Sequence, residues 1–213
     1  MARPSQPLIS RDATVEAALK IIDSEGLEAL SLPRLAREMN VKAPSLYHHF
    51  SDKNEILSAV ASRIISKTTL PRPSPTDDWA EWFTQLALNT RVAVLRHRNA
   101  APILLQHLPR EVTTDLYERA ASYLAECGVP KELHMQILDG LEKLSLGSAI
   151  AEATHPRPRN RVGFDNVDPE AHPTLTAALK ANKLSPRQIF EHTVRCYLLG
   201  MAHFGQLDQE RIA

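Results

Sequence analysis

The sequence has little glycine, little cysteine and few aromatic residues. It holds 7 glycines and 2 cysteines in 213 residues, and aromatic residues make up 5% of it. Scarce glycine, beside plentiful alanine, leucine, glutamate and arginine, favours helices over strands. Cys127 and Cys196 lie far apart and give neither a zinc-binding spacing nor a disulfide framework. We expect both thiols to be buried, as free cysteines commonly are.

An excess of charge of one sign is also lacking. Lysine and arginine number 25, aspartate and glutamate number 25, and the formal net charge is zero. Because nucleic-acid-binding domains commonly show a basic excess, any DNA binding must rest on a local motif here. No apolar run approaches the roughly 20 residues that cross a bilayer, and no signal peptide is visible. We therefore expect a cytoplasmic protein with no membrane association.

Helical periodicity governs the first 40 residues. Apolar side chains recur at the i, i+3, i+4, i+7 spacing over 11–25, which predicts a helix. Ser10 is a suitable N-cap for it, and Gly26 a suitable stop. Ser31 then caps a second, short helix. Asn40 tolerates the left-handed backbone conformation and so predicts a tight end to that helix.

A third short helix is expected from Ala43 to about Phe50, because proline is permitted in a first turn. Ser51 is expected to cap a fourth helix that reaches about Thr69. The proline-rich stretch 70–75 cannot stay helical. We place a boundary there, with a helix-turn-helix DNA-binding domain over 1–70 and a helical effector-binding and dimerisation domain over 71–213.

The second domain repeats the helical pattern. Helices are expected from 79 onward, over 99–107, 116–124, 133–155, 174–182 and 186–204, with a loop over 156–173. No strand hairpin and no internal repeat is visible. The predicted fold class is all-α.

The segment 30–53, LSLPRLAREMNVKAPSLYHHFSDK, predicts a helix-turn-helix. In such a motif the first helix braces the second, which presents its N-terminal residues to the major groove. Apolar residues at inward positions would hold the two helices at a fixed angle. They are Leu35, Ala36, Val41, Leu46 and Phe50.

This segment resembles the tetracycline-repressor (TetR) family. The pattern that carries the resemblance is Leu35-Ala36, Val41, the run SLYHHF over 45–50, and Lys53. The likeness extends over about residues 11–64. One departure is Asn40, where the family usually has glycine, and asparagine can adopt the same backbone geometry.

The resemblance implies roles for single residues. In the family the start of the third helix faces bases, which implicates Lys42, Ala43, Pro44, Ser45 and, further along, His48. Family positions that hold phosphates are matched by Ser31, Tyr47 and Lys53.

Plainer roles stay open for these positions. Ser31 can be an N-cap alone, Tyr47 a core aromatic, and Lys53 a solvated charge. Because His48 and His49 are adjacent on a helix and point apart, we expect no metal there.

The resemblance also implies an effector pocket among the middle helices, and dimerisation through the last two long ones. The candidate pocket residues, each of which can instead be plain core, are Trp82, Phe83, Leu86, Leu104, His107, Leu108, Leu141 and Leu144. The tetracycline-binding branch uses a histidine to bind the drug's magnesium, and Leu104 stands at that position. Since leucine offers no ligand atom, we expect a more apolar effector, with no metal or cofactor.

Motifs for catalysis are absent from the sequence. GxSxG, P-loop, HExxH and dinucleotide-binding patterns do not occur. We therefore expect a regulator and not an enzyme. Its expected partners are a palindromic double-stranded DNA operator, a second copy of the chain, and a small effector that releases the repressor. Activation in place of repression stays open, because it depends on the position of the operator.

Overall fold

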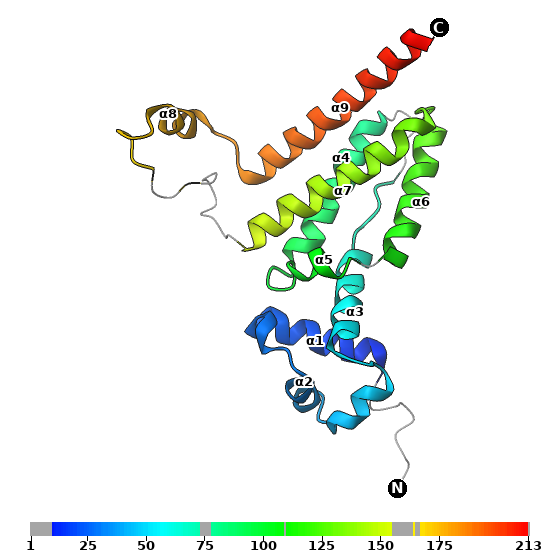
Figure 1. Ribbon diagram of the computed structural model, residues 1–213, viewed down its shortest axis with the longest axis vertical. Coiled ribbons are helices and arrows are strands. Elements are labelled where there is room, and N and C mark those ends of the chain that lie inside the picture. The colour runs from blue at the N-terminus through cyan, green and yellow to red at the C-terminus, as the bar shows by residue number, and fades with distance from the viewer. Residues whose placement is uncertain (1–9, 73–77, 109, 155–163, 165–166, 213) are drawn as a thin grey trace.

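The computed structural model describes residues 10–72, 78–108, 110–154, 164 and 167–212, with side chains up to residue 204. Within these ranges the chain is built of helices and turns and holds no strand, which confirms the all-α prediction. Figure 1 shows an elongated molecule with a small head near the N-terminus and a larger helical body. No described helix is long and apolar enough to cross a membrane.

The head consists of short helices. They are α1 (Arg11–Glu25), the 3₁₀ turn η1 (Leu27–Ala29), α2 (Leu32–Glu38), the 3₁₀ helix η2 (Ala43–His48) and α3 (Lys53–Ser66). The expected start and stop of α1 are confirmed. Ser10 Oγ accepts a hydrogen bond from the Ala13 amide at 3.1 Å, and Gly26 has a φ of 91°.

Longer helices form the body. They are α4 (Trp79–Leu95), α5 (Ile103–Gln106), α6 (Arg110–Glu126), α7 (Lys131–Thr154), α8 (Pro173–Ala181) and α9 (Pro186–Ile212). Helix α7 is central and packs against α4, α6 and α9. Helix α8 has no buried residue and stands apart from the body near the start of α9 (Figure 1).

Two apolar cores hold these elements. The first joins α1, α2, η2 and α3 to α5 and the end of α7, so one continuous core crosses residue 70. The second lies among α4, α6, α7 and α9. Its aromatic centre is Trp82, whose ring centroid lies 4.8 Å from that of Phe83 and 4.6 Å from that of Tyr123.

Three local expectations are corrected. The third helix is a 3₁₀ helix that ends at His48, not an α-helix that reaches Phe50. The cap of α3 is Asp52, whose carboxylate accepts from the Glu55 amide, and not Ser51. Both Cys127 and Cys196 are exposed in the single chain and not buried.

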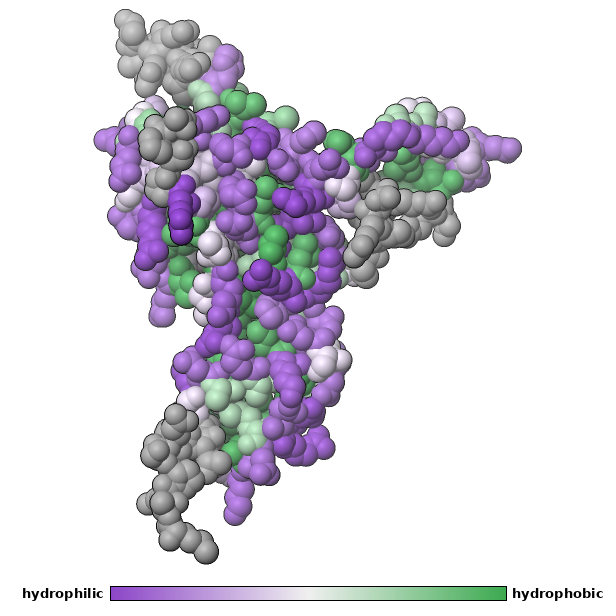
Figure 2. Space-filling model, turned by 180° about the vertical axis from the view of Figure 1, so that it is seen from behind, coloured by the Kyte–Doolittle hydropathy of each residue, from purple (hydrophilic) through white to green (hydrophobic). Residues whose placement is uncertain are grey.

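The surface is mostly polar. Figure 2 shows hydrophilic side chains over most of the rear face, with hydrophobic residues visible in the body and at the waist between head and body. The loop expected over 156–173 lies mostly outside the described residues.

Candidate DNA-reading surface and effector cavity

The turn between α2 and η2 is fixed by Asn40. Its φ is 52°, the one positive φ of a non-glycine residue in the described ranges. The Val41 amide donates to the Ala36 carbonyl at 2.9 Å, and the Asn40 amide to the Arg37 carbonyl at 3.1 Å. This pair of bonds is a Schellman motif, which satisfies the last carbonyls of α2 and sends the chain straight into η2.

Burial separates the two faces of η2. Leu46 is fully buried and Phe50 is 2% exposed, so this side anchors the segment to the head core. On the other side Lys42, Pro44 and His48 are exposed, while Ala43 and Ser45 are half-buried. The residues for which the resemblance implies base contacts therefore lie together along the short segment 42–48, which we call the reading segment.

Tyr47 projects from the same segment. Its side chain is 57% exposed, which disfavours the alternative of a core aromatic. Ser31 is also exposed, and its Oγ accepts from the Arg34 amide at 3.3 Å, so it caps α2 as predicted. In the first turn of α2, Pro33 has no amide hydrogen, and the Arg34 and Leu35 amides both donate to Ser31. The Ser31 hydroxyl and the Leu32 amide are therefore the groups that face outward for a phosphate.

The two arginines of α2 differ in whether their guanidinium groups are free to bind DNA. Arg34 is bound by Glu25 at 2.5 Å and by Glu38 at 3.0 Å, and these carboxylates raise the pKa of its guanidinium. Arg37 is exposed, and no hydrogen bond or ion pair of its guanidinium occurs within the described part of the chain. Arg37 is a further basic group beside the reading segment that the sequence reasoning did not single out.

Hydrogen bonds and an ion pair of Glu55 hold the start of α3 to Ser51 and to the start of α1. Glu55 accepts from the Ser51 amide at 2.7 Å, from the Ser51 hydroxyl at 3.0 Å and from Arg11 Nη1 at 2.7 Å. The Ser51 amide and then Arg11 lower the pKa of Glu55 to about 2. Lys53, the first residue of α3, is half-buried at this junction.

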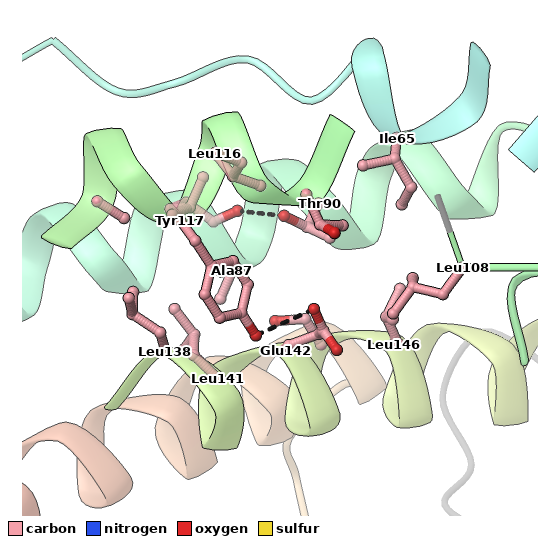
Figure 3. Close-up of a pocket in the computed structure, with 14 residues that line it drawn as sticks. Ile65, Ala87, Thr90, Leu108, Leu116, Tyr117, Leu138, Leu141, Glu142 and Leu146 are labelled. Carbon is pink, nitrogen blue, oxygen red and sulfur yellow. Dashed lines mark hydrogen bonds between the residues drawn. The ribbon is translucent and has the colours of Figure 1, made fainter. Parts of the chain in front are cut away.

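A cavity lies in the body between α4, α6 and α7, and the last turn of α3 reaches it (Figure 3). Its free volume is about 60 Å³, which is below the roughly 300–1,000 Å³ of small-molecule sites, so a ligand of that size has to widen it. The residues that line it are Ile65, Leu86, Ala87, Thr90, Leu108, Thr113, Leu116, Tyr117, Ala120, Leu138, Leu141, Glu142, Ser145 and Leu146.

Three of the eight pocket candidates line this cavity, namely Leu86, Leu108 and Leu141. The other five lie elsewhere. Trp82 and Phe83 belong to the second core, and Leu104, 1% exposed, belongs to the first.

The last two candidates face other neighbours. His107 Nδ1 lies 3.3 Å from Ser58 Oγ of α3. Leu144 lines a separate groove between α7 and α9. Helical periodicity identifies inward faces, but it does not say which core or cavity each face meets.

The cavity contains a polar pair that the sequence reasoning missed. The Tyr117 hydroxyl of α6 donates to a Glu142 carboxylate oxygen of α7 at 3.0 Å (Figure 3). Burial, and then the nearby charge of Glu142, raise the pKa of Tyr117, so its phenol stays a donor. The two residues lie 25 positions apart, and no sequence motif joins them.

Contacts tie the head to the body. His97 Nδ1, in the turn after α4, lies 2.7 Å from the Asp23 carboxylate near the end of α1. Asn99 Nδ2 donates to the Asp23 carbonyl at 3.0 Å. In the same region Glu152 of α7 binds both Arg91 and Arg98. The body is therefore in contact with the head through α1 as well as through α3.

Comparisons with known proteins agree with this geometry. Residues 15–60 match the family described as bacterial regulatory proteins, tetR family, and residues 70–203 match the tetracyclin repressor-like C-terminal domain. Tetracycline repressor protein class E of Escherichia coli is 27% identical over 208 residues, which is 95% of this chain and 94% of that protein.

Solved structures are similar over most of the chain. ActR of Streptomyces coelicolor in complex with (S)-DNPA is 26% identical with a TM-score of 0.76, covering 93% of this chain and 99% of that one. BioQ with its double-stranded DNA operator is 27% identical with a TM-score of 0.60, covering 70% and 90%. The chain therefore belongs to the tetR family of bacterial regulatory proteins, which are DNA-binding regulators and not enzymes.

Proposed function

We propose that this protein is a dimeric, cytoplasmic repressor that an apolar small molecule in the α4–α6–α7 cavity releases from a palindromic operator. The observation that carries the proposal is the course of α3. This helix starts at Lys53, beside the reading segment, and its last turn places Ile65 in the wall of the cavity. One rigid element thus touches both candidate sites.

The mechanism follows from this connection. A molecule that fills the cavity presses on Ile65 and shifts the end of α3, while Ser51 and Arg11 hold the start of α3 to the head. The head then turns with α3, and the spacing of the two reading segments in a dimer changes. The effector needs only a higher affinity for the released arrangement than for the DNA-bound one.

Two structurally similar proteins support the proposal that this protein binds both an operator and a small molecule. The BioQ relative binds a double-stranded operator, and the ActR relative binds the small molecule (S)-DNPA. Because both resemble this chain across head and body, the same two classes of partner are proposed here.

The dimer is proposed from α9. Leu199 is 60% exposed and Phe204 61% exposed on this helix, and such apolar exposure on a long helix suits a subunit interface. Two reading heads related by two-fold symmetry would contact half-sites one DNA turn apart. Because both heads of the dimer bind the same operator, their two sets of base contacts add, and small base-facing side chains can still select a sequence.

Fluorescence anisotropy with labelled duplex DNA tests the reading surface. Tyr47→Ala and Lys53→Ala should weaken all sequences alike, and Lys53→Ala should also lower the salt dependence by about one unit of slope. Lys42→Ala should relax the sequence preference in addition. Lys131→Ala, an exposed lysine at the start of α7, is the matched control and should change nothing. Wild-type affinity in Tyr47→Ala and Lys53→Ala would refute the assignment.

A cavity-filling variant tests the coupling. Ser145 is 2% exposed and lines the cavity, so Ser145→Phe places a ring where the effector would lie. Its operator affinity should fall without any effector, while its helix content by circular dichroism stays unchanged. A folded Ser145→Phe variant with wild-type operator affinity would contradict coupling through α3.

A further inference from the structure

One charged side chain stands in an otherwise uncharged cavity wall. Nine of the fourteen lining residues are apolar, four carry hydroxyls, and Glu142 carries the carboxylate. Figure 3 shows Glu142 and Tyr117 side by side at the centre of the lining, with leucines on both sides. Glu142 is half-buried in these surroundings, and hydrogen-bond donors or a cation stabilise a carboxylate that has lost part of its hydration.

The protein satisfies this carboxylate only in part. An ionised carboxylate offers about four acceptor positions. Among the described residues one donor reaches Glu142, the Tyr117 hydroxyl at 3.0 Å. No lysine, arginine or histidine of the described chain lies within 4.0 Å of it, although ten other carboxylates among the described residues have such partners. A cation that binds Glu142 would therefore come from outside this part of the chain.

No charge on a neighbouring residue takes the place of a cation beside Glu142. Asp139, one turn before Glu142, is bound by Lys143, and its charge raises the pKa of Tyr117 while the charge of Arg110 lowers it. The Tyr117 phenol, whose pKa is raised by burial and by Glu142, remains a neutral donor. Neither Asp139 nor Tyr117 therefore supplies a positive charge to Glu142.

We infer that the effector is an apolar molecule that carries a protonated amine, and that this amine binds the Glu142 carboxylate while the rest of the molecule contacts the leucine lining. The inference rests on the proposed function, since it names the ligand class of that same cavity. A charge-assisted N–H···O bond is about twice as strong as a neutral one, so the amine is favoured over a hydroxyl. An anionic ligand would meet the carboxylate at close range and be repelled.

Three probes of similar shape test the inference. They are 1-naphthylmethylamine, which is a cation at neutral pH, 1-methylnaphthalene, which has no donor, and 1-naphthoate, which is an anion. Isothermal titration calorimetry of the full chain should show the amine binding about tenfold or more tighter than the hydrocarbon. The anion should bind most weakly. Equal affinities, tighter binding of the hydrocarbon or of the anion, or no measurable binding of the amine would overturn the inference.

Variants locate the amine at Glu142. Glu142→Gln keeps the size and the acceptor for Tyr117 but removes the charge, so it should lower amine affinity about tenfold and leave the hydrocarbon unchanged. Tyr117→Phe keeps the charge and should retain tight amine binding. Glu118→Gln, an exposed glutamate of α6, is the matched control. Undiminished amine binding by a folded Glu142→Gln variant would also overturn the inference.

Operator release separates this inference from the proposed function. If the amine binds through Glu142 but no probe releases DNA, the ligand class stands and the repressor mechanism fails. If the hydrocarbon or the anion releases the operator and the amine has no advantage in binding, the repressor mechanism stands and the ligand class fails.

Discussion

The imidazole Nδ1 of His97 lies 2.7 Å from the carboxylate of Asp23, although 74 residues separate them. Asn99 Nδ2 adds a second bond to the Asp23 carbonyl at 3.0 Å. The turn that follows α4 therefore holds the end of α1 at two points. We expect this contact to orient the head relative to the body.

Loss of the Asp23 side chain should loosen that contact. Both partners are about a quarter to a third exposed, so Asp23→Ala should lower the free energy of unfolding by less than about 1 kcal/mol. Operator affinity should fall more clearly, by up to about tenfold, because the heads are no longer held in the binding geometry. Anisotropy titration and urea unfolding measure the two effects. Glu28→Ala, at an exposed position of the same head, is the control. Unaltered operator affinity in Asp23→Ala would show that the contact does not orient the head.

The turn at Asn40 predicts a sensitive pair of substitutions. With a φ of 52°, alanine at this position should cost about 1–2 kcal/mol, since its Cβ opposes the left-handed conformation. Glycine should be neutral within about 0.5 kcal/mol, because it adopts that conformation freely. Urea denaturation followed by circular dichroism compares the two. Equal stability of Asn40→Ala and Asn40→Gly would mean that the turn relaxes without strain.

The approach of α9 to α7 depends on Gly140. A Cβ at this position would clash with the Tyr197 hydroxyl, which donates to the Gln136 carbonyl at 2.5 Å. Gly140→Ala should therefore destabilise the protein by about 1–3 kcal/mol and lower the thermal midpoint. Gly147→Ala, on the same helix with open space around its Cβ, should instead be neutral or stabilising by up to about 1 kcal/mol. A thermal midpoint of Gly140→Ala at or above that of Gly147→Ala would contradict the packing.

Glu55 predicts a dependence of stability on pH. Its pKa is held at about 2 in the folded chain, below the ordinary value of about 4.3 for glutamate. Its contribution is therefore complete above about pH 4.3 and is lost as the pH falls toward 2. The stability advantage of the wild type over Glu55→Gln should be constant from pH 7 to 5 and shrink between pH 4.3 and 3. Urea midpoints at each pH give that difference, and an advantage that stays constant down to pH 3 would exclude the lowered pKa.

Local signals predicted the head well. The side chains that cap α1 and α2, the stop at Gly26 and the turn at Asn40 depend on residues within five positions of each other, so they can be inferred from the local sequence. The expectation that Ser51 caps α3 is wrong, because the Ser51 amide and hydroxyl donate to Glu55 while Asp52 accepts from the Glu55 amide. The 3₁₀ form of η2 also escaped prediction, since its apolar spacing does not distinguish it from a short α-helix.

The sequence did not predict which residues far apart in the chain would contact one another. Phe83 and Leu86 share one face of α4, yet Phe83 enters the second core while Leu86 reaches the cavity. Their fates depend on where α6 and α7 lie, which no periodicity encodes. The pairing of Tyr117 with Glu142 depends on the same arrangement, and it became visible only in the folded chain.

The reading surface can be tested most directly by selecting bound duplexes from a random DNA library with the full-length protein. A dimer with two reading segments predicts an inverted repeat whose half-site centres lie about one helical turn, 10–10.5 base pairs, or a multiple of it apart. Lys42→Ala should enrich the same spacing with a weaker base preference next to that residue. Failure of the wild type to enrich any sequence, or enrichment of an isolated single half-site, would contradict the dimeric operator-binding repressor proposed here.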